Sequence, residues 1–174
     1  MMMNAKTLAE YLIYLNHKIQ GQDTDITPMK LQKLLYYCQG YSLALTGKPI
    51  FSEPIEACAH GPVIDSVYQE YKKYKNDVIP VSEKINFEDI DETAKSIADL
   101  VVDEKKWLSA YALSDSTESE ADFHNDIISN EKIKNFFSRE FLKWEESEDE
   151  EDSLWLSVGK PVSREEMEEA LAEL

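Results

Sequence analysis

The chain is poor in the residues on which most catalytic and cofactor motifs depend. Its 174 residues include five glycines, three histidines and two cysteines. Five glycines cannot build a nucleotide fingerprint or a phosphate loop. The histidines, His17, His60 and His124, stand too far from one another and from Cys38 and Cys58 for a close-paired zinc pattern. We therefore predict no metal site, no cofactor and no catalytic residues.

Basic residues are also scarce, since 18 Lys and Arg face 35 Asp and Glu and leave a net charge of −17. This charge repels the phosphates of nucleic acids and anionic lipids, because such binding depends on neutralising phosphates with Lys and Arg. Direct nucleic-acid binding is therefore disfavoured. A basic protein is the natural complement, and the alternative is that the acidity only keeps the protein in solution.

Long apolar runs are absent, and none reaches the length needed to span a membrane. The first residues do not resemble a signal sequence, because charged Glu10 interrupts their helical apolar pattern. We expect a cytoplasmic protein without membrane attachment. Cys38 falls on an apolar helical stripe and should behave as a small hydrophobic residue, although a disulfide with Cys58 stays open at this point.

The hydrophobic pattern predicts a mainly α fold, and 43% apolar content allows one substantial core with an appendage. The predicted helices cover residues 4–18, 27–46, a segment that opens on Gly61-Pro62-Val63 and ends near 76–77, and then 91–102, 105–113 and 130–144. Strand propensity is confined to residues 50–59 and 78–81. We predict a compact domain of five or six helices with at most a short β-hairpin.

The helix over residues 27–46 has the clearest start and end. Thr27 is a suitable N-cap, Pro28 suits the first helical position, and Gly47 can end the helix in a left-handed turn. Its inner stripe holds Leu31, Leu34, Leu35 and Cys38. The stripe predicts that Lys30 and Lys33 lie at its border or on the solvent face.

Composition changes after Trp144 and divides the chain into three parts. Residues 1–144 form the helical domain, and residues 145–152, with seven acids in eight positions, form an acidic linker. Residues 153–174 form a C-terminal amphipathic extension with a short helix that starts at a capping box on Ser163. Residues 140–174 hold 13 acidic and 3 basic residues, a net of −10.

The extension carries an apolar set that includes Trp155, Met167 and Leu171. A helix this short must dock on another surface to be stable. Two interpretations stay open: it folds back on its own domain, or it lies in a groove of a basic partner. In the second, the apolar residues supply affinity and the acids supply selectivity.

One local cluster offers chemistry, because Glu56, Cys58 and His60 alternate along a predicted extended segment and would share one face. A Cys–His nucleophile is conceivable, but nothing in the sequence supplies an oriented third member. We favour the interpretation that Glu56 and His60 hold the turn or line a recognition groove.

Several separated elements resemble the Panacea family, whose members include SocA-like and GepA-like proteins. They are Thr27–Tyr37, Pro49-Ile50-Phe51, Ile55-Glu56-Ala57, Gly61-Pro62-Val63 and Val67-Tyr68. The resemblance implies a compact, mostly helical antitoxin of a toxin–antitoxin pair, or a related prophage protein, that binds a partner protein rather than catalysing a reaction. It covers Lys30, Glu56, Gly61, Pro62 and Tyr68 together, which favours a polar groove where Lys30 lies near Glu56 and Tyr68.

We therefore predict an antitoxin-like protein that neutralises or sequesters a basic toxin or effector by direct binding, or hands it to a protease system. One alternative is a phage counter-defence protein whose carboxylates occupy the nucleic-acid groove of a basic effector. A less favoured one is a small enzyme that uses Cys58 and His60.

Overall fold

The computed structural model describes residues 3–58, 61–84, 86–105 and 127–146, with side chains up to residue 142. In chain order the elements are α1 (Ala5–Gln20), the 3-10 helix η1 (Gly21–Asp23), α2 (Pro28–Thr46), β1 (Ile55–Cys58), β2 (Gly61–Val63), α3 (Asp65–Tyr71), the 3-10 helix η2 (Lys72–Tyr74), α4 (Glu92–Lys105), β3 (Ile127–Ile128) and α6 (Asn130–Glu146). The prediction of a mainly helical fold with a small β element is confirmed. The predicted helix over 105–113, the linker beyond Glu146 and the C-terminal extension lie outside the described residues.

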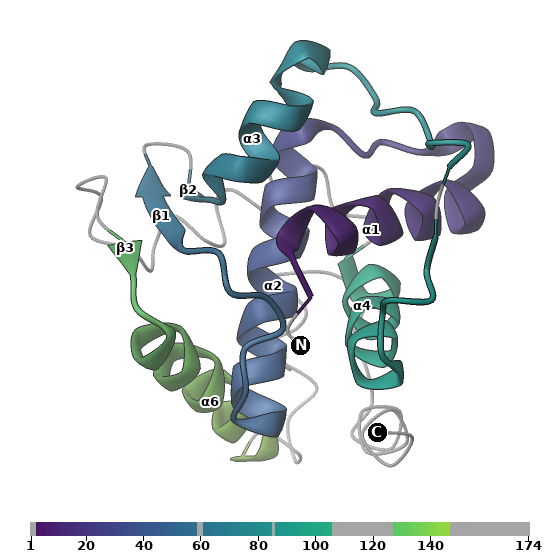
Figure 1. Cartoon of the computed structure of the whole chain (residues 1–174). Coiled ribbons are helices and arrows are strands. Elements are labelled where there is room, and N and C mark those ends of the chain that lie inside the picture. The colour runs from purple at the N-terminus through teal and green to yellow at the C-terminus, as the bar shows by residue number, and fades with distance from the viewer. Residues whose placement is uncertain (1–2, 59–60, 85, 106–126, 147–174) are drawn as a thin grey trace.

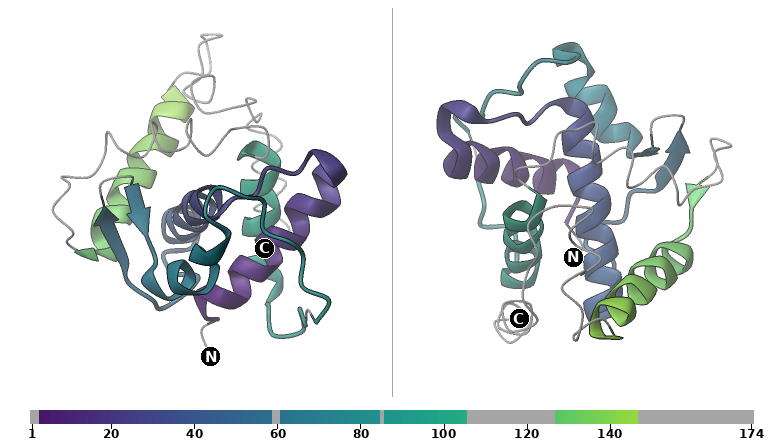
Figure 2. Two further views of the ribbon diagram at one scale, coloured as in Figure 1. Left: turned by 90° about the horizontal axis from the view of Figure 1, so that it is seen from above. Right: turned by 180° about the vertical axis from the view of Figure 1, so that it is seen from behind.

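Helix α2 is the centre of the fold. The other elements surround it, with α1 and α4 on one side and α6 and the sheet on the other (Figures 1 and 2). Every residue from Lys30 to Leu43 is buried. The predicted apolar stripe therefore describes only one of the buried faces of α2, because a helix covered on all sides has no solvent face over that stretch. Lys30 and Lys33 are both buried, so their predicted position at the border or on the solvent face is wrong.

The predicted start and end of α2 are confirmed, while α1, α4 and α6 end at Gln20, Lys105 and Glu146, two or three residues beyond their predicted ends. The Thr27 hydroxyl accepts a hydrogen bond from the Lys30 N–H at 3.3 Å, and Pro28 occupies the first turn of α2. Gly47 closes α2 with φ 76°, a left-handed conformation that glycine adopts without steric cost. Side chains also cap the starts of the other long helices: Asn4 for α1, Asp91 for α4 and Ser129 for α6.

One predicted helix start is wrong. Gly61–Val63 does not open a helix but forms strand β2, which pairs antiparallel with β1, and α3 begins at Asp65. The reason is tertiary, because β1 offers backbone groups that the hairpin satisfies, and Pro62 is tolerated in a strand at the edge of the described sheet.

Two further differences concern the strands. The sheet has the order β2-β1-β3, so a third strand, contributed by residues 127–128, joins the β1–β2 hairpin. Residues 78–81 form no strand in the described structure. One backbone hydrogen bond connects this segment to the loop before α2: the Ile79 N–H donates to the Ile26 carbonyl at 2.9 Å.

Helix α6 packs on α2 through aromatic rings. Phe137 lies edge-on to Tyr36, Tyr37 and Tyr41, with ring centroids 5.4, 5.8 and 5.9 Å away. The approach depends on Gly40, because a Cβ built there would lie 2.1 Å from the Phe137 ring. Of the predicted inner face, Ile133 and Phe137 are buried and Phe136 and Phe141 are partly buried, while the side chain of Trp144 lies outside the described set.

Candidate functional site: an apolar groove between α2, the hairpin and α3

A groove of about 460 Å³ opens where the first turns of α2 meet the β1–β2 hairpin and α3. We call it the α2–α3 groove. It is lined by Pro28, Met29, Gln32, Lys33, Glu56, Cys58, Pro62, Val63, Asp65, Tyr68, Lys75 and Asn76. Three predicted site residues, Glu56, Pro62 and Tyr68, therefore meet in one place.

The base of the α2–α3 groove is held by Gln32, whose side chain is buried. Its Oε1 accepts a hydrogen bond from the Ile64 N–H at 2.8 Å, and its Nε2 donates to the Ile64 carbonyl at 3.2 Å. Ile64 is the residue between β2 and α3; its carbonyl also accepts hydrogen bonds from the Val67 and Tyr68 N–H groups of α3, so Gln32 matters most for its N–H group. Gln32 therefore supplies the hydrogen bonds that fix α3 against α2.

Gln39 repeats this arrangement seven residues later on α2. Its Oε1 accepts from the Ile50 N–H at 2.9 Å, and its Nε2 donates to the Phe51 carbonyl at 3.2 Å. The sequence reasoning missed both glutamines. The signal was present, because residues seven apart lie on the same face of a helix, and these two follow directly after stripe residues Leu31 and Cys38.

The surface of the α2–α3 groove is mainly apolar with balanced charges. Tyr68 is 47% exposed and Met29 is 37% exposed, and the two belong to the few large apolar side chains that stay open to solvent in the described structure. The charged lining residues are two lysines, Lys33 and Lys75, and two carboxylates, Glu56 and Asp65. Exposed aromatic and methionine side chains on a concave surface are typical of protein-binding sites. Tyr68 is therefore a surface residue, whereas tyrosines that recur at helical spacing more often belong to the core.

The chemistry at Cys58 does not favour a nucleophile. Burial raises the pKa of its thiol, the neighbouring Glu56 carboxylate raises it further, and Lys33 only partly opposes them. A reactive cysteine needs the opposite shift, because the thiolate is the attacking form. His60, its proposed base, lies outside the described residues, so the structure does not place the Cys58–His60 pair.

Lys30 does not belong to the groove lining, and Lys33 takes that position instead. The Lys30 side chain has no exposed surface, and its ammonium donates to Asp25 Oδ1 at 2.5 Å. Burial lowers the pKa of Lys30, and the Asp25 carboxylate acts in the other direction. We therefore assign Lys30 a role in fixing the loop before α2, and its predicted place in partner binding stays a prediction.

The remaining predicted site residues divide into two sets. Gly61 is buried in β2 and pairs with Cys58 at the end of the hairpin. His60, Trp155, Met167 and Leu171 lie outside the described residues. For the part of the chain that the structure covers, no group of three metal-ligating side chains comes together, and no helix has the length and apolarity to cross a membrane.

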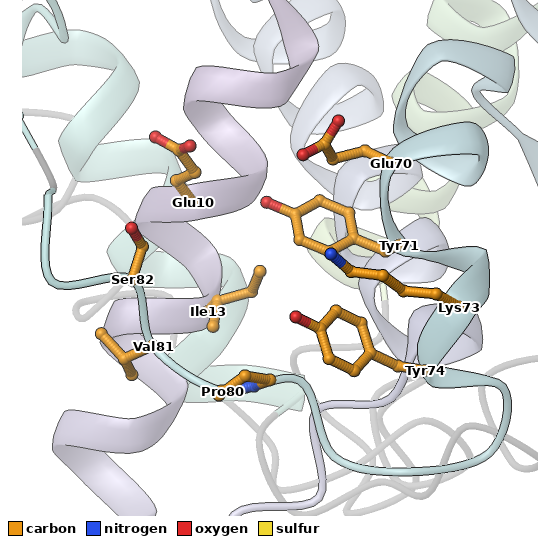
Figure 3. A pocket seen from close by; sticks show the side chains of 9 residues that line it. All are labelled: Glu10, Ile13, Glu70, Tyr71, Lys73, Tyr74, Pro80, Val81 and Ser82. Carbon is orange, nitrogen blue, oxygen red and sulfur yellow. The ribbon is translucent and has the colours of Figure 1, made fainter.

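A second concave site lies between α1, α3 and the segment 80–82 (Figure 3). We call it the Tyr71 pocket; its volume is about 260 Å³. It is lined by Glu10 and Ile13 of α1, Glu70 and Tyr71 of α3, Lys73 and Tyr74 of η2, and Pro80, Val81 and Ser82. The hydroxyl groups of Tyr71 and Tyr74 and the ammonium group of Lys73 all point from the α3–η2 side toward α1 and the 80–82 segment (Figure 3).

Burial raises the pKa of Tyr71 strongly, and the carboxylates of Glu10 and Glu70 contribute in the same direction. Two carboxylates, Glu10 and Glu70, thus outnumber the one ammonium group, that of Lys73, in the lining of the Tyr71 pocket. Lys73 already places its ammonium group 5.3 Å from the centre of the Tyr74 ring, a cation–π distance.

Comparison with family models finds one that matches residues 31–168, more than half of the chain, and its description is "Antitoxin SocA-like, Panacea domain". Comparison with curated proteins and with solved structures finds no match.

Proposed function

The chain belongs to the SocA-like, Panacea-domain antitoxin family, and from this premise we propose that it neutralises a cytoplasmic protein toxin by direct binding through the α2–α3 groove. The observation that supports the groove is the pair of exposed side chains, Tyr68 and Met29, over a concave apolar surface. Interfaces concentrate their binding energy in such residues, and tyrosine is among the commonest hot spots.

The groove is suited to an apolar segment of the toxin rather than to a charged one, because its lysines and carboxylates balance. The excess negative charge of the chain, −17 overall, lies outside the groove. It would accelerate the encounter with a basic toxin, but it would not determine which toxin segment fits the groove. Binding therefore divides into a short-range apolar contact and a long-range electrostatic attraction.

The test starts from the open reading frame next to this one in the genome. It should stop growth when expressed alone and permit growth when this chain is co-expressed. Tyr68→Ala should then weaken the purified complex by about 30-fold or more, the equivalent of roughly 2 kcal/mol at a hot spot. Leu142→Ala is the matched control, because Leu142 is 56% exposed but lies on α6, away from the groove.

The level of the toxin separates two mechanisms. If the toxin accumulates as a stable one-to-one complex, it is neutralised by masking. If it disappears in cells with an intact protease system and returns when that system is deleted, the chain delivers it for degradation. A neighbour without toxicity, or rescue that is indifferent to both Tyr68→Ala and Met29→Ala in folded protein, contradicts the proposal.

A further inference from the structure

The Tyr71 pocket has a shape and chemistry that the α2–α3 groove lacks. Its volume of about 260 Å³ is below the roughly 300–1,000 Å³ typical of pockets for drug-sized ligands. It is large enough for one long side chain. Its walls combine two carboxylates from different helices with two tyrosine rings, which is the combination that attracts an organic cation.

The two carboxylates of the Tyr71 pocket, Glu10 and Glu70, have few polar contacts in the described structure. Within the described structure Glu10, which is half-buried, makes no hydrogen bond or ion pair. Glu70 meets Lys6 at 3.8 Å, and both side chains of that pair are about half exposed, so the contact contributes little. Tyr71 has no hydrogen-bond partner for its hydroxyl in the same part of the chain. The acceptors around the pocket are therefore available to a donor from outside.

Lys73 shows what the pocket attracts. It lies on η2, is exposed, and holds its ammonium group over the Tyr74 ring at the pocket. An exposed lysine loses side-chain entropy in such an arrangement, which the nearby carboxylates and the ring must offset. Lys73 acts as an internal cation that a stronger one can displace.

We propose that the Tyr71 pocket receives an arginine side chain of the toxin whose apolar segment occupies the α2–α3 groove. This inference rests on the proposed function for the identity of the partner, but not for the chemistry of the pocket. Helix α3 connects the two sites, since Tyr68 faces the groove while Tyr71 lines the pocket. A partner that crosses α3 contacts both.

Arginine fits better than lysine for two reasons. Its planar guanidinium stacks on a tyrosine ring, and its five donors reach carboxylates on both sides, here Glu10 of α1 and Glu70 of α3. A compact ammonium presents three donors and is more strongly hydrated, which makes its transfer into the pocket less favourable. Arginine is also enriched at the core of protein interfaces.

The first experiment needs no toxin. The full chain is titrated with Nα-acetyl-arginine amide, and the chemical shifts of Tyr71 and Tyr74 are followed by NMR; Nα-acetyl-citrulline amide, of nearly the same shape without the charge, is the control. The arginine compound should bind at least about tenfold more tightly, the effect expected of one cation–π contact with a carboxylate partner. Equal shifts from both compounds, or no shift at these tyrosines, overturn the proposal.

Variants test the charge assignment. Glu10→Gln combined with Glu70→Gln should remove the preference for arginine over citrulline. Lys73→Met should increase the affinity for the arginine compound, because it removes the competing cation. Glu88→Gln, an exposed carboxylate outside both sites, is the control and should change nothing. A purely structural role for Glu10 and Glu70 predicts no gain from Lys73→Met, so the absence of that gain counts against the pocket.

The same variants separate this inference from the proposed function. If Tyr68→Ala abolishes protection from the toxin while the Glu10/Glu70 double variant retains full affinity for the toxin, the groove stands and the arginine site fails. If the arginine compound binds as expected but no toxin is neutralised, the pocket stands and the antitoxin assignment fails.

Discussion

The buried amide of Gln32 offers the sharpest test of how the groove is built. Substitution of Gln32 by Met keeps the length of the side chain and removes both hydrogen bonds to Ile64, at 2.8 and 3.2 Å. The Ile64 N–H would then be buried without a partner, since Ile64 is almost fully covered, while its carbonyl would keep the hydrogen bonds from Val67 and Tyr68. An unsatisfied buried group costs about 1–3 kcal/mol, so we expect the free energy of unfolding to fall by roughly that amount.

Urea denaturation followed by circular dichroism measures this loss. With a slope of about 2 kcal/mol per M, typical for small proteins, the midpoint should fall by roughly 0.5–1.5 M. Gln69→Met is the matched control, because Gln69 is an exposed glutamine of α3 whose side chain bonds only to other exposed side chains, and its substitution should stay within about 0.5 kcal/mol.

A local opening of α3 would escape a global measurement, so exchange of the Ile64 amide hydrogen provides a second readout. It should accelerate in Gln32→Met even if the urea midpoint moves little. The reasoning is refuted if the variant unfolds at the same urea concentration as the control and its Ile64 amide exchanges at the wild-type rate.

Three further predictions follow from the interior of the fold. Gly40→Ala should lower stability by about 3 kcal/mol, because the new methyl group overlaps the Phe137 ring, and the added change Phe137→Leu should recover part of that loss in urea denaturation. Because the pKa of Lys30 is lower in the folded chain than in the unfolded one, the unfolded chain binds more protons between the two values, and stability rises with pH over that window. Unfolding measured from pH 7 toward 10.5 should show that Lys30→Met removes this rise while the change Lys48→Met at an exposed position keeps it. Thr27→Ala should cost about 1 kcal/mol through loss of the α2 cap, and an unchanged melting curve would contradict the capping assignment.

Much of the fold is a local property of the chain and could be predicted from it. The starts of α1, α2, α4 and α6 follow from capping residues whose side chains reach backbone groups three positions away. The end of α2 follows from a glycine that adopts a left-handed turn. The family, with its antitoxin role, could be inferred because its residues stand in order along the chain.

The candidate site could be predicted only in part. Glu56, Pro62 and Tyr68 were expected at one site and line one groove. Lys33 was expected at the border of the apolar stripe and lies buried at that groove, while Lys30 pairs with Asp25. Helical periodicity distinguishes one face from another, but it does not reveal how many neighbours surround the helix.

Composition, short-range spacing and end signals determined which segments are helical and that the protein is acidic, because these properties depend on residues close together in the chain. Only the tertiary structure decided that Gly61–Val63 is a strand, that α2 is enclosed on every side, and that Glu10 of α1 faces Tyr71 across a pocket. Strand β2 depends on pairing with β1, which helical periodicity does not contain. The other two features depend on partners many positions away, which cover a side chain or supply a charge that no local pattern contains.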